Sequence, residues 1–435
     1  MSRNLQSPSL LMKTMYLDIS VPHIVLTRLL GKLSPAAYFA PTSSLRLAEM
    51  ADPPLPAANW VRVRNRLCGI CGSDLHQIFV DSGLDVAPVA LPSHKRIYLG
   101  HEMVGEVVEL HPASAPGLQV GDRVVRWGRA DDCRARGLPE SDYCPPCRRG
   151  HRVLCQRASE PKAHTPIGGG FGDTFISPAA ALVPVLDGLS DEQAIFTEPC
   201  AVAIHAAWRK IPKPGDKVLV YGVGPIGFLL IQALAALETG CEITAVAQYP
   251  WQADLARQFG AQHIIFAHED GYEATVELTG ASLYAGRGDN RMLLGGFDIV
   301  FDVVGSEATL NNALRWTRAG GAVVLVGVNL HRMKLDVTPI WYQEVDLLGA
   351  VGHDVVDWQG ESLSTFDLAM RWMRDGKFQV EPLLTHRFPL ADYRRAFQVA
   401  IDKKTYQSVK VAFDFGLGIS DFGEANPKSE IPNQK

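Results

Sequence analysis

The chain of 435 residues carries 42 Lys and Arg against 47 Asp and Glu, a formal net charge of −5, and 47% hydrophobic residues. This length and balance are enough to bury a core in two or three globular domains. The sequence has no basic stripe of the kind that binds nucleic acids, and no apolar run approaches the roughly 20 residues that span a bilayer. The start of the chain lacks an apolar segment followed by a small-residue cleavage site. We therefore expect a cytoplasmic protein without nucleic-acid or membrane partners.

Up to about residue 200, the sequence predicts short β-strands joined by turns. Its apolar runs are brief, as in WVRVRNRL, MVGEVVEL and GDRVVRW, and Gly and Pro separate them. Residues 215 to 345 change to strand, glycine turn, long apolar helix and strand, which is typical of βαβ units on a parallel sheet. After residue 345 we expect helices in TFDLAMRWMRDGK and ADYRRAFQVAIDKK, and a strand in SVKVAFDF. A polar tail after residue 416 is expected to lack regular structure.

The turn GVGPIG places Gly222, Gly224 and Gly227 in the spacing G-x-G-x-x-G, with Pro225 and Ile226 between the last two. It follows the apolar strand KVLVY and opens an apolar helix, which is the context that dinucleotide binding requires. The first glycine allows a tight turn, the second lets the backbone approach a pyrophosphate, and the third allows close helix packing. The turn therefore predicts that NAD or NADP binds at the helix N-terminus.

One position decides how the ribose of that dinucleotide is recognised. The acidic residue that usually bonds the 2′-hydroxyl would stand about 20 residues beyond the last glycine, and Ala247 occupies its place. Without a carboxylate nothing repels a 2′-phosphate, but no Arg or Lys stands beside the position to attract one. Gln248, Tyr249 and Gln252 can hydrogen-bond either form. The choice between NAD and NADP stays open, with a small preference for NADP.

Clustered cysteines in a long chain without a secretion signal favour metal binding over disulfides. Cys71 stands in the string CGICGSDLH, His101 follows in GHE, and Glu198 stands in EP before the glycine turn. A thiolate, an imidazole and a carboxylate are ligand types suited to Zn²⁺. Cys68, three residues before Cys71, is interpreted as a small buried hydrophobe.

Taken together, these strings resemble the zinc-dependent medium-chain alcohol dehydrogenases over roughly residues 56 to 415. The strings GICGSDLH, GHE, GDRV, CPPCRRGHRVLC, EPCAVAIHA and GVGPIG follow the family's order, and EPCAVAIHA resembles the polyol, threonine and butanediol dehydrogenase branch. The resemblance implies an α/β fold with the active site in the cleft between two domains. A β-rich, GroES-like catalytic zinc domain would cover residues 1–200 and 346–435. A Rossmann domain with a doubly wound parallel sheet would cover residues 201–345.

Carried onto this chain, the resemblance makes Cys71 and His101 ligands of a catalytic zinc. Glu102 and Glu198 would take the remaining positions, and one of them could bind through water. The alternative for Glu102 is to support the ligands by hydrogen bonding, and Cys200 is a less favoured alternative ligand.

The resemblance also assigns roles in proton transfer. Ser73 would contact the substrate oxygen and relay its proton, and His76 would pass that proton to solvent. Asp74 would orient His101. The alternative for Ser73 and Asp74 is to cap the helix that follows Cys71.

A second zinc, of structural type, is implied by four thiolates in the family spacing C-x2-C-x2-C-x7-C. Cys144, Cys147 and Cys155 fit the last three positions, and Cys133 stands near the first. The string RARGLPESDY separates Cys133 from Cys144. An insertion there preserves a closed site because longer loops cost little extra closure entropy. The alternative is a site that has lost its metal.

Two segments depart from the family pattern and receive no functional assignment. They are the long start of 55 residues and the interruption LTGASLYAGRGDNRMLLGG, residues 278–296. The start is expected to cover the catalytic domain or to join a subunit interface.

The predicted activity is hydride transfer between a secondary alcohol, polyol or sugar hydroxyl and the nicotinamide, giving a ketone or lactone. We expect a homo-oligomer, dimer or tetramer, that acts on a small molecule. The alternatives are a zinc-free quinone or enoyl reductase of the same architecture and a non-enzymatic nucleotide-binding protein with structural zinc only.

Overall fold

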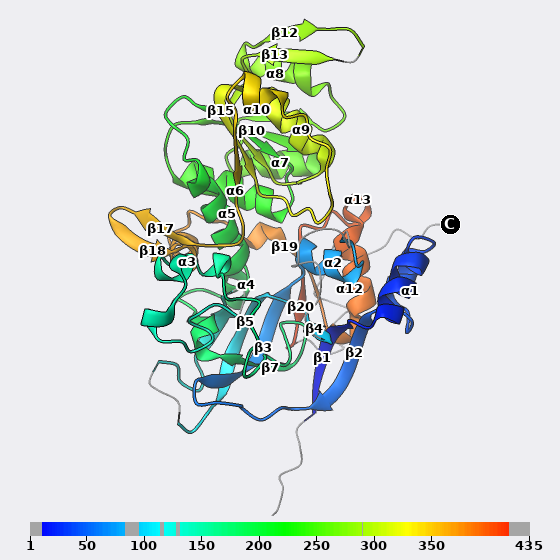
Figure 1. Ribbon diagram of the computed structural model, residues 1–435, viewed down its shortest axis with the longest axis vertical. Coiled ribbons are helices and arrows are strands. Elements are labelled where there is room, and N and C mark those ends of the chain that lie inside the picture. The colour runs from blue at the N-terminus through cyan, green and yellow to red at the C-terminus, as the bar shows by residue number, and fades with distance from the viewer. Residues whose placement is uncertain (1–10, 83–94, 114–116, 128–130, 289, 417–435) are drawn as a thin grey trace, which may run out of the picture. The chain divides into compact units, whose positions relative to one another are not determined.

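The computed structural model describes residues 11–82, 95–113, 117–127, 131–288 and 290–416 (Figure 1). The chain forms two compact units, one of Met1–Glu198 with Leu383–Lys435 and one of Pro199–Pro382. Within the described ranges, no helix has the length and apolar character needed to cross a membrane. The tail expected to lack regular structure, after residue 416, lies outside the described residues.

The first unit is built on a mixed seven-stranded sheet in the order β19-β20-β3-β5-β6-β8, with β7 also pairing with β3. Its strands are β3 (Trp60–Gly69), β5 (Glu102–Leu110), β6 (Arg123–Arg126), β7 (Thr174–Pro178), β8 (Leu182–Pro184), β19 (Leu384–Phe388) and β20 (Lys410–Asp414). The register pairs Gly69 of β3 with Glu102 of β5 and with Ala412 of β20. Three distant segments of the chain therefore meet where β3 ends.

The helices of this unit are short. They are α1 (Val21–Gly31), α2 (Gly72–Ile78), α3 (Pro145–Arg148), α4 (Asp191–Ala194), α12 (Tyr393–Ile401) and α13 (Lys403–Tyr406). The chain returns to the first unit at Leu383 and there forms β19, then α12 and α13, and finally β20.

The long start of the chain is an insertion within a β-hairpin. Strands β1 (Leu11–Asp18) and β2 (Leu45–Ala51) pair antiparallel, and β1 also pairs with β4 (Arg96–Tyr98). Helix α1 and the 3₁₀ helix η1 (Pro35–Phe39) connect the two hairpin strands. From η1, Tyr38 packs against Phe79 at the end of α2, with ring centroids 4.6 Å apart, and Phe39 stacks on Phe397 at 5.7 Å. The insertion thus covers part of the first unit, as one of the two expectations stated.

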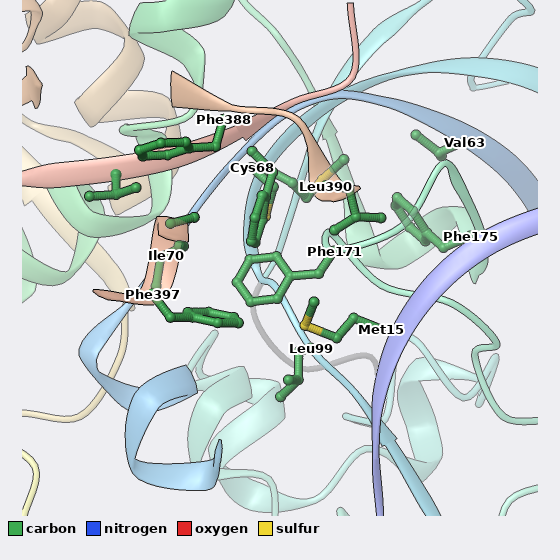
Figure 2. Close-up of a cluster of buried hydrophobic side chains, with 14 of the residues drawn as sticks. Met15, Val63, Cys68, Ile70, Leu99, Phe171, Phe175, Phe388, Leu390 and Phe397 are labelled. Carbon is green, nitrogen blue, oxygen red and sulfur yellow. The ribbon is translucent and has the colours of Figure 1, made fainter. Parts of the chain in front are cut away.

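Phe171 lies at the centre of the first unit's core, between Met15, Leu99 and Phe397 (Figure 2). Its ring meets that of Phe413 at 4.9 Å, edge to face. Its backbone accepts a hydrogen bond from the N–H of Met15 at 2.7 Å and donates one to the carbonyl of Leu99 at 3.1 Å. Because Leu99 stands two residues before His101, the core fixes the segment that presents this histidine.

The second unit contains a six-stranded parallel sheet in the order β11-β10-β9-β14-β15-β16. The strands are β9 (Lys217–Tyr221), β10 (Glu242–Ala247), β11 (His263–Phe266), β14 (Phe297–Asp302), β15 (Thr317–Leu325) and β16 (Asp346–Gly349). The helices are α5 (Thr197–Arg209), α6 (Pro225–Ala236), α7 (Pro250–Gln258), α8 (Gly271–Thr279), α9 (Glu307–Trp316), α10 (Thr338–Tyr342) and α11 (Thr365–Arg374). The order places β9 centrally, with β10 and β14 on its two sides, as in a doubly wound sheet.

Two features of the second unit differ from the expected domain limits. Strand β16 pairs with β15, so the parallel sheet extends beyond residue 345, and the chain rejoins the first unit only at Leu383. The helix of residues 365–374, which was expected in the first unit, therefore belongs to the second. The interruption at 278–296 forms the hairpin of β12 (Ser282–Ala285) and β13 (Arg291–Leu294), and a second hairpin joins β17 (Val355–Trp358) to β18 (Glu361–Ser364).

Replacing Phe171 by alanine tests the role of this core. The substitution removes a fully buried ring, so we expect the free energy of unfolding to fall by about 3–5 kcal/mol in chemical denaturation. Leu29→Ala is the control, since Leu29 is 61% exposed and should change stability by less than about 0.5 kcal/mol. A loss of under about 1 kcal/mol for Phe171→Ala would show that the core is not centred on this ring.

Candidate active site and metal centres

Cys71 stands at the junction between β3 and α2. Its backbone is extended, with φ −89°, and its N–H donates to Asp74 Oδ2 at 3.0 Å. The other oxygen of Asp74, Oδ1, accepts the N–H of Gly100 at 3.3 Å and lies 3.4 Å from His101 Nδ1. Asp74 therefore caps the helix and also contacts the imidazole, so the two roles considered for it from the sequence are compatible.

His101 lies between two polar side chains of α2. Its Nδ1 faces Asp74, and its Nε2 lies 3.4 Å from Ser73 Oγ. Burial lowers the pKa of His101, but the charge and hydrogen bond of Asp74, together with Cys71, raise that pKa well above its ordinary value. The ring is thus oriented by Asp74 on one side and presents its other nitrogen beside Ser73.

Cys71, His101 and Glu102 bring their ligand atoms within 4.8 Å of one another. Glu102 is 1% exposed, and its Oε2 lies 2.5 Å from the ammonium of Lys410, which is 3% exposed. Among the described residues, Glu102 Oε1 is buried and has no hydrogen-bond partner. A carboxylate close to a thiol and an imidazole, with one buried oxygen left unpartnered, fits a divalent metal ion that prefers mixed sulfur, nitrogen and oxygen ligands.

Glu198 does not join that group of three within the described part of the chain. It lies in the first turn of α5 and interacts electrostatically with His101 and Glu102. Burial raises the pKa of Glu198 to about 7; the charge of His101 opposes this shift and that of Glu102 adds to it. Glu198 thus stands near the three residues without sharing their close approach.

Two further residues of the string CGICGSDLH have distinct surroundings. Cys68 is fully buried, and burial raises the pKa of its thiol well above the ordinary value. A Cβ on Gly170 would lie 2.4 Å from Cys68 Sγ, so the thiol fills core space. His76 is 41% exposed, and its Nδ1 lies 3.1 Å from Asp81 Oδ2.

The four cysteines predicted to hold a structural zinc meet in the structure. The ligand atoms of Cys133, Cys144, Cys147 and Cys155 lie within 4.8 Å of one another, and none forms a disulfide. Burial raises the pKa of Cys144, but hydrogen bonds from the backbone of Cys147 and Gln156 bring it down to about 7. Four thiols at this spacing fit a closed tetrahedral site.

An ion pair that the sequence did not indicate supports the same lobe. Asp132, next to Cys133, accepts the N–H groups of Arg134 and Ala135 at 2.9 and 3.2 Å. Its second oxygen lies 2.9 Å from Arg152 Nη2. The insertion after Cys133 therefore starts from a fixed turn.

The glycine turn of the second unit has the geometry that its spacing predicts. Gly222 follows β9 with φ +100°, and a Cβ there would lie 2.5 Å from Val304 Cγ2. A Cβ on Gly227 would lie 2.1 Å from the carbonyl oxygen of Gly222. Gly224 is the N-cap of α6, and Pro225 and Ile226 begin that helix. Side chains are excluded at both packed positions, so the backbone of the turn stays accessible to a pyrophosphate.

At the end of β10, Ala247 is fully buried. Gln252 Oε1 accepts the N–H groups of Gln248 and Tyr249 at 3.0 and 3.2 Å. That oxygen therefore stabilises the turn into α7 and is not available to a ribose. Gln248 is exposed, so its side chain can still contact the nucleotide.

Comparison with known proteins shows which protein family the chain resembles. Residues 57–187 match the alcohol dehydrogenase GroES-like domain, and residues 225–367 match the zinc-binding dehydrogenase family. The chain is 30% identical over 387 residues to L-idonate 5-dehydrogenase of Vitis vinifera, covering 88% of this chain and 95% of that protein. It is 28% identical over 368 residues to D-arabinitol dehydrogenase 1 of Uromyces fabae, covering 83% and 92%. The crystal structure of 2R,3R-butanediol dehydrogenase from Bacillus subtilis shares 25% identity, with a TM-score of 0.66, over 93% of this chain and 99% of that one.

A GroES-like unit with a parallel nucleotide-binding sheet defines a class of dehydrogenases that use zinc and a nicotinamide cofactor. The chain belongs to the zinc-dependent medium-chain alcohol and polyol dehydrogenase family. The predicted fold class, enzyme class and cofactors, Zn²⁺ and NAD(P), are confirmed at this level. Family membership favours this class over the zinc-free reductase and the non-enzymatic alternative.

Replacing Lys410 tests the buried ion pair. Lys410→Met leaves the Glu102 charge buried without its cation, so we expect the free energy of unfolding to fall by about 3–5 kcal/mol. The double variant Lys410→Met with Glu102→Gln removes the uncompensated charge and should recover most of that loss in the same denaturation experiment. A double variant less stable than Lys410→Met would contradict the assignment.

Proposed function

We propose that the protein oxidises a secondary hydroxyl of a polyol or sugar to a carbonyl, and catalyses the reverse reduction, with NAD or NADP carrying the hydride. The observation that carries the proposal is the approach of Cys71, His101 and Glu102 within 4.8 Å, with one buried oxygen of Glu102 unpartnered. The names of the similar proteins support a polyhydroxylated substrate, since they refer to L-idonate, D-arabinitol and sorbitol.

Cys71, His101 and Glu102 would hold the catalytic Zn²⁺, with Glu198 as a further oxygen donor. When bound, the ion polarises the substrate hydroxyl and lowers its pKa toward neutrality. Asp74 holds the imidazole of His101 by its Nδ1 side, which leaves Nε2 directed toward Ser73 and the metal site. Lys410 binds Glu102 Oε2, so that Oε1 is the oxygen left for the metal.

Ser73 and His76 would move the substrate proton. Ser73 Oγ lies 3.4 Å from His101 Nε2, so a hydroxyl group bound at the metal site is within reach of its oxygen. Ser73 would accept that proton while it gives up its own hydroxyl proton, and His76, on the same helix and 41% exposed, would take up the proton passed on and release it to solvent. The carboxylate of Asp81 beside His76 Nδ1 stabilises the ring when it carries the proton.

For the nucleotide, we propose that Gly222, Gly224 and Gly227 bring the backbone of the turn to the pyrophosphate. Pro225 and Ile226 begin the helix whose N-terminus faces that group. Ala247 and Gln248 would lie at the ribose. Because no carboxylate stands at Ala247, nothing there repels a 2′-phosphate, and we expect a small preference for NADP over NAD.

We further infer a cytoplasmic location and a homo-oligomer, dimer or tetramer. None of the eight free cysteines is exposed, and seven of them lie in the two metal groups or in the buried core. Such thiols keep their metal-binding form in a reducing compartment.

The activity is tested with the zinc-loaded protein and D-sorbitol, D-arabinitol, 2R,3R-butanediol and L-threonine, each with NAD and with NADP, by absorbance of the reduced cofactor. We expect turnover with at least one polyol. Cys71→Ser should lower kcat by roughly a thousandfold or more, because the metal supplies several kcal/mol of stabilisation to the developing negative oxygen.

Binding of reduced cofactor to Cys71→Ser, followed by fluorescence, should stay within about twofold of the parent, since the glycine turn is in the other unit. Cys241→Ser is the matched control, because Cys241 belongs to neither metal group. Absence of turnover over the whole panel, or full activity of Cys71→Ser, would refute the proposed function.

Metal content is a separate prediction. The purified protein should hold about two zinc ions per chain, one in each group of ligands. Cys147→Ser should hold about one and unfold at lower temperature, because a structural zinc site contributes folding energy. Cys71→Ser should also hold about one zinc ion but keep the parent melting temperature more closely. A single zinc ion in the parent that is lost only with Cys71→Ser would show that the four-cysteine lobe is empty.

A further inference from the structure

Helix α1 exposes its large apolar side chains and buries its small ones. Figure 1 shows the helix at the outer edge of the first unit. Its buried residues are Thr27 and Gly31, the reverse of an ordinary surface helix, which turns its leucines toward the core. Six large apolar side chains of the helix and the turn after it, here called the apolar face of α1, are 36–82% exposed: Val21, Val25, Leu26, Leu29, Leu30 and Leu33.

Hydrogen bonds and close packing fix this orientation of the helix. The N–H of Ser44 donates to Thr27 Oγ1 at 2.8 Å, and the hydroxyl of Thr27 donates to the carbonyl of His23 at 2.6 Å. A Cβ on Gly31 would lie 2.3 Å from the ring of Tyr38, so only glycine allows the helix to pack this closely. Rotating α1 to bury its leucines would break these contacts. The exposure of the apolar face is therefore a property of the folded insertion.

The apolar face forms two adjacent rows along the helix. Residues four apart lie on the same side of a helix, so residues 21, 25, 29 and 33 make one row and residues 26 and 30 the next. A third row, next to the first, holds the basic residues Arg28 and Lys32. The exposed side of α1 thus combines a continuous apolar surface with a basic edge. A contiguous apolar surface of this kind marks an interaction site.

The charge of the whole insertion has one sign. Between Asp18 and Glu49 the sequence contains Arg28, Lys32 and Arg46 and no acidic residue, although the full chain has a net charge of −5. In the part of the chain that the structure describes, no carboxylate lies within ion-pair distance of Arg28 or Lys32. Both charges are therefore available to an anionic partner.

Area and charge favour a lipid surface over a second copy of the chain. A specific protein interface takes about 20–30 residues from each side, whereas the apolar face offers six side chains. A two-fold contact through α1 would also bring the basic edges of the two copies into one interface, where like charges repel. A helix lying in a bilayer surface needs only a narrow apolar face, sunk about 5–10 Å into the lipid, with basic residues at the headgroups.

We propose that the first unit binds the surface of a membrane containing anionic lipids through α1. The apolar face lies at the boundary of the acyl chains, and Arg28 and Lys32 contact the negatively charged headgroups. The sequence predicted no membrane partner because it lacks a spanning segment, but a helix that lies in the surface does not need one. Cytoplasmic leaflets carry anionic lipids, in agreement with the proposed location. The inference does not depend on the substrate of the enzyme.

The test is cosedimentation of the zinc-loaded full chain with vesicles of phosphatidylcholine, with or without phosphatidylserine at about 30 mol%. The parent should bind the anionic vesicles, bind the neutral ones far less, and release from the anionic ones as salt is raised. Leu29→Gln should weaken binding by about tenfold, because it removes apolar surface from the buried face. Arg28→Gln and Lys32→Gln should each weaken it by about fivefold on anionic vesicles, and Arg28→Lys should keep parent binding.

Val120→Gln is the matched control, because Val120 lies in the same unit and is 62% exposed, against 61% for Leu29. It should leave vesicle binding unchanged. Parent-like melting temperatures for all variants would show that differences in binding do not come from unfolding. Equal binding of the parent and Leu29→Gln, equal binding to both kinds of vesicle, or binding to neither would overturn the inference.

Light scattering without vesicles tests the second copy as the alternative occupant of the same face. An unchanged molar mass for Leu29→Gln supports the lipid surface. A smaller assembly for Leu29→Gln than for the parent and Val120→Gln would show that α1 joins copies of the chain, and would overturn the inference.

Discussion

The buried pair of Lys410 and Glu102 is the interaction on which the rest of the first unit's chemistry depends. The two residues are 308 positions apart in sequence, and the ammonium and carboxylate meet at 2.5 Å where β20 and β5 both border the end of β3. Taking two charges out of water is costly, and their geometry must be close to repay it. The pair therefore requires that the C-terminal strand return to the first unit, and it leaves Oε1 as the Glu102 oxygen without a hydrogen-bond partner among the described residues.

The position of His101 depends on a second constraint, which is the packing of Gly100 against the core. Gly100 has φ +85°, and a Cβ there would lie 2.6 Å from both the ring and the backbone nitrogen of Phe171. The backbone can therefore turn into β5 only at a residue without a side chain. The same turn donates its N–H to Asp74, which also contacts the ring of His101. Core packing and orientation of the metal ligand are thus set by one short segment.

Local strings predicted the parts of this site that lie on single turns. Cys71, Ser73, Asp74 and His76 share one strand-to-helix junction, and Gly222, Gly224 and Gly227 share another, so their spacing carried the geometry. Local spacing could not predict the partner of Glu102. Lys410 comes close to Glu102 only because β20 and β5 both pair with β3. The limit of the second unit at Pro382 was also missed, since β16 is recognised by its pairing with β15 and not by its own composition. The insertion of α1 looked like an extension because nothing in the sequence showed that β1 and β2 pair.

Charge balance connects Lys410 with the metal site. Cys71, Asp74, Glu102 and Glu198 supply up to four negative charges in one region, and Lys410 neutralises one of them directly. The rise in the pKa of Glu198 reflects burial first, and the repulsion from Glu102 and Asp74 adds to it. A divalent cation offsets two further charges, which is the electrostatic reason for a thiolate and carboxylates to be placed so close together.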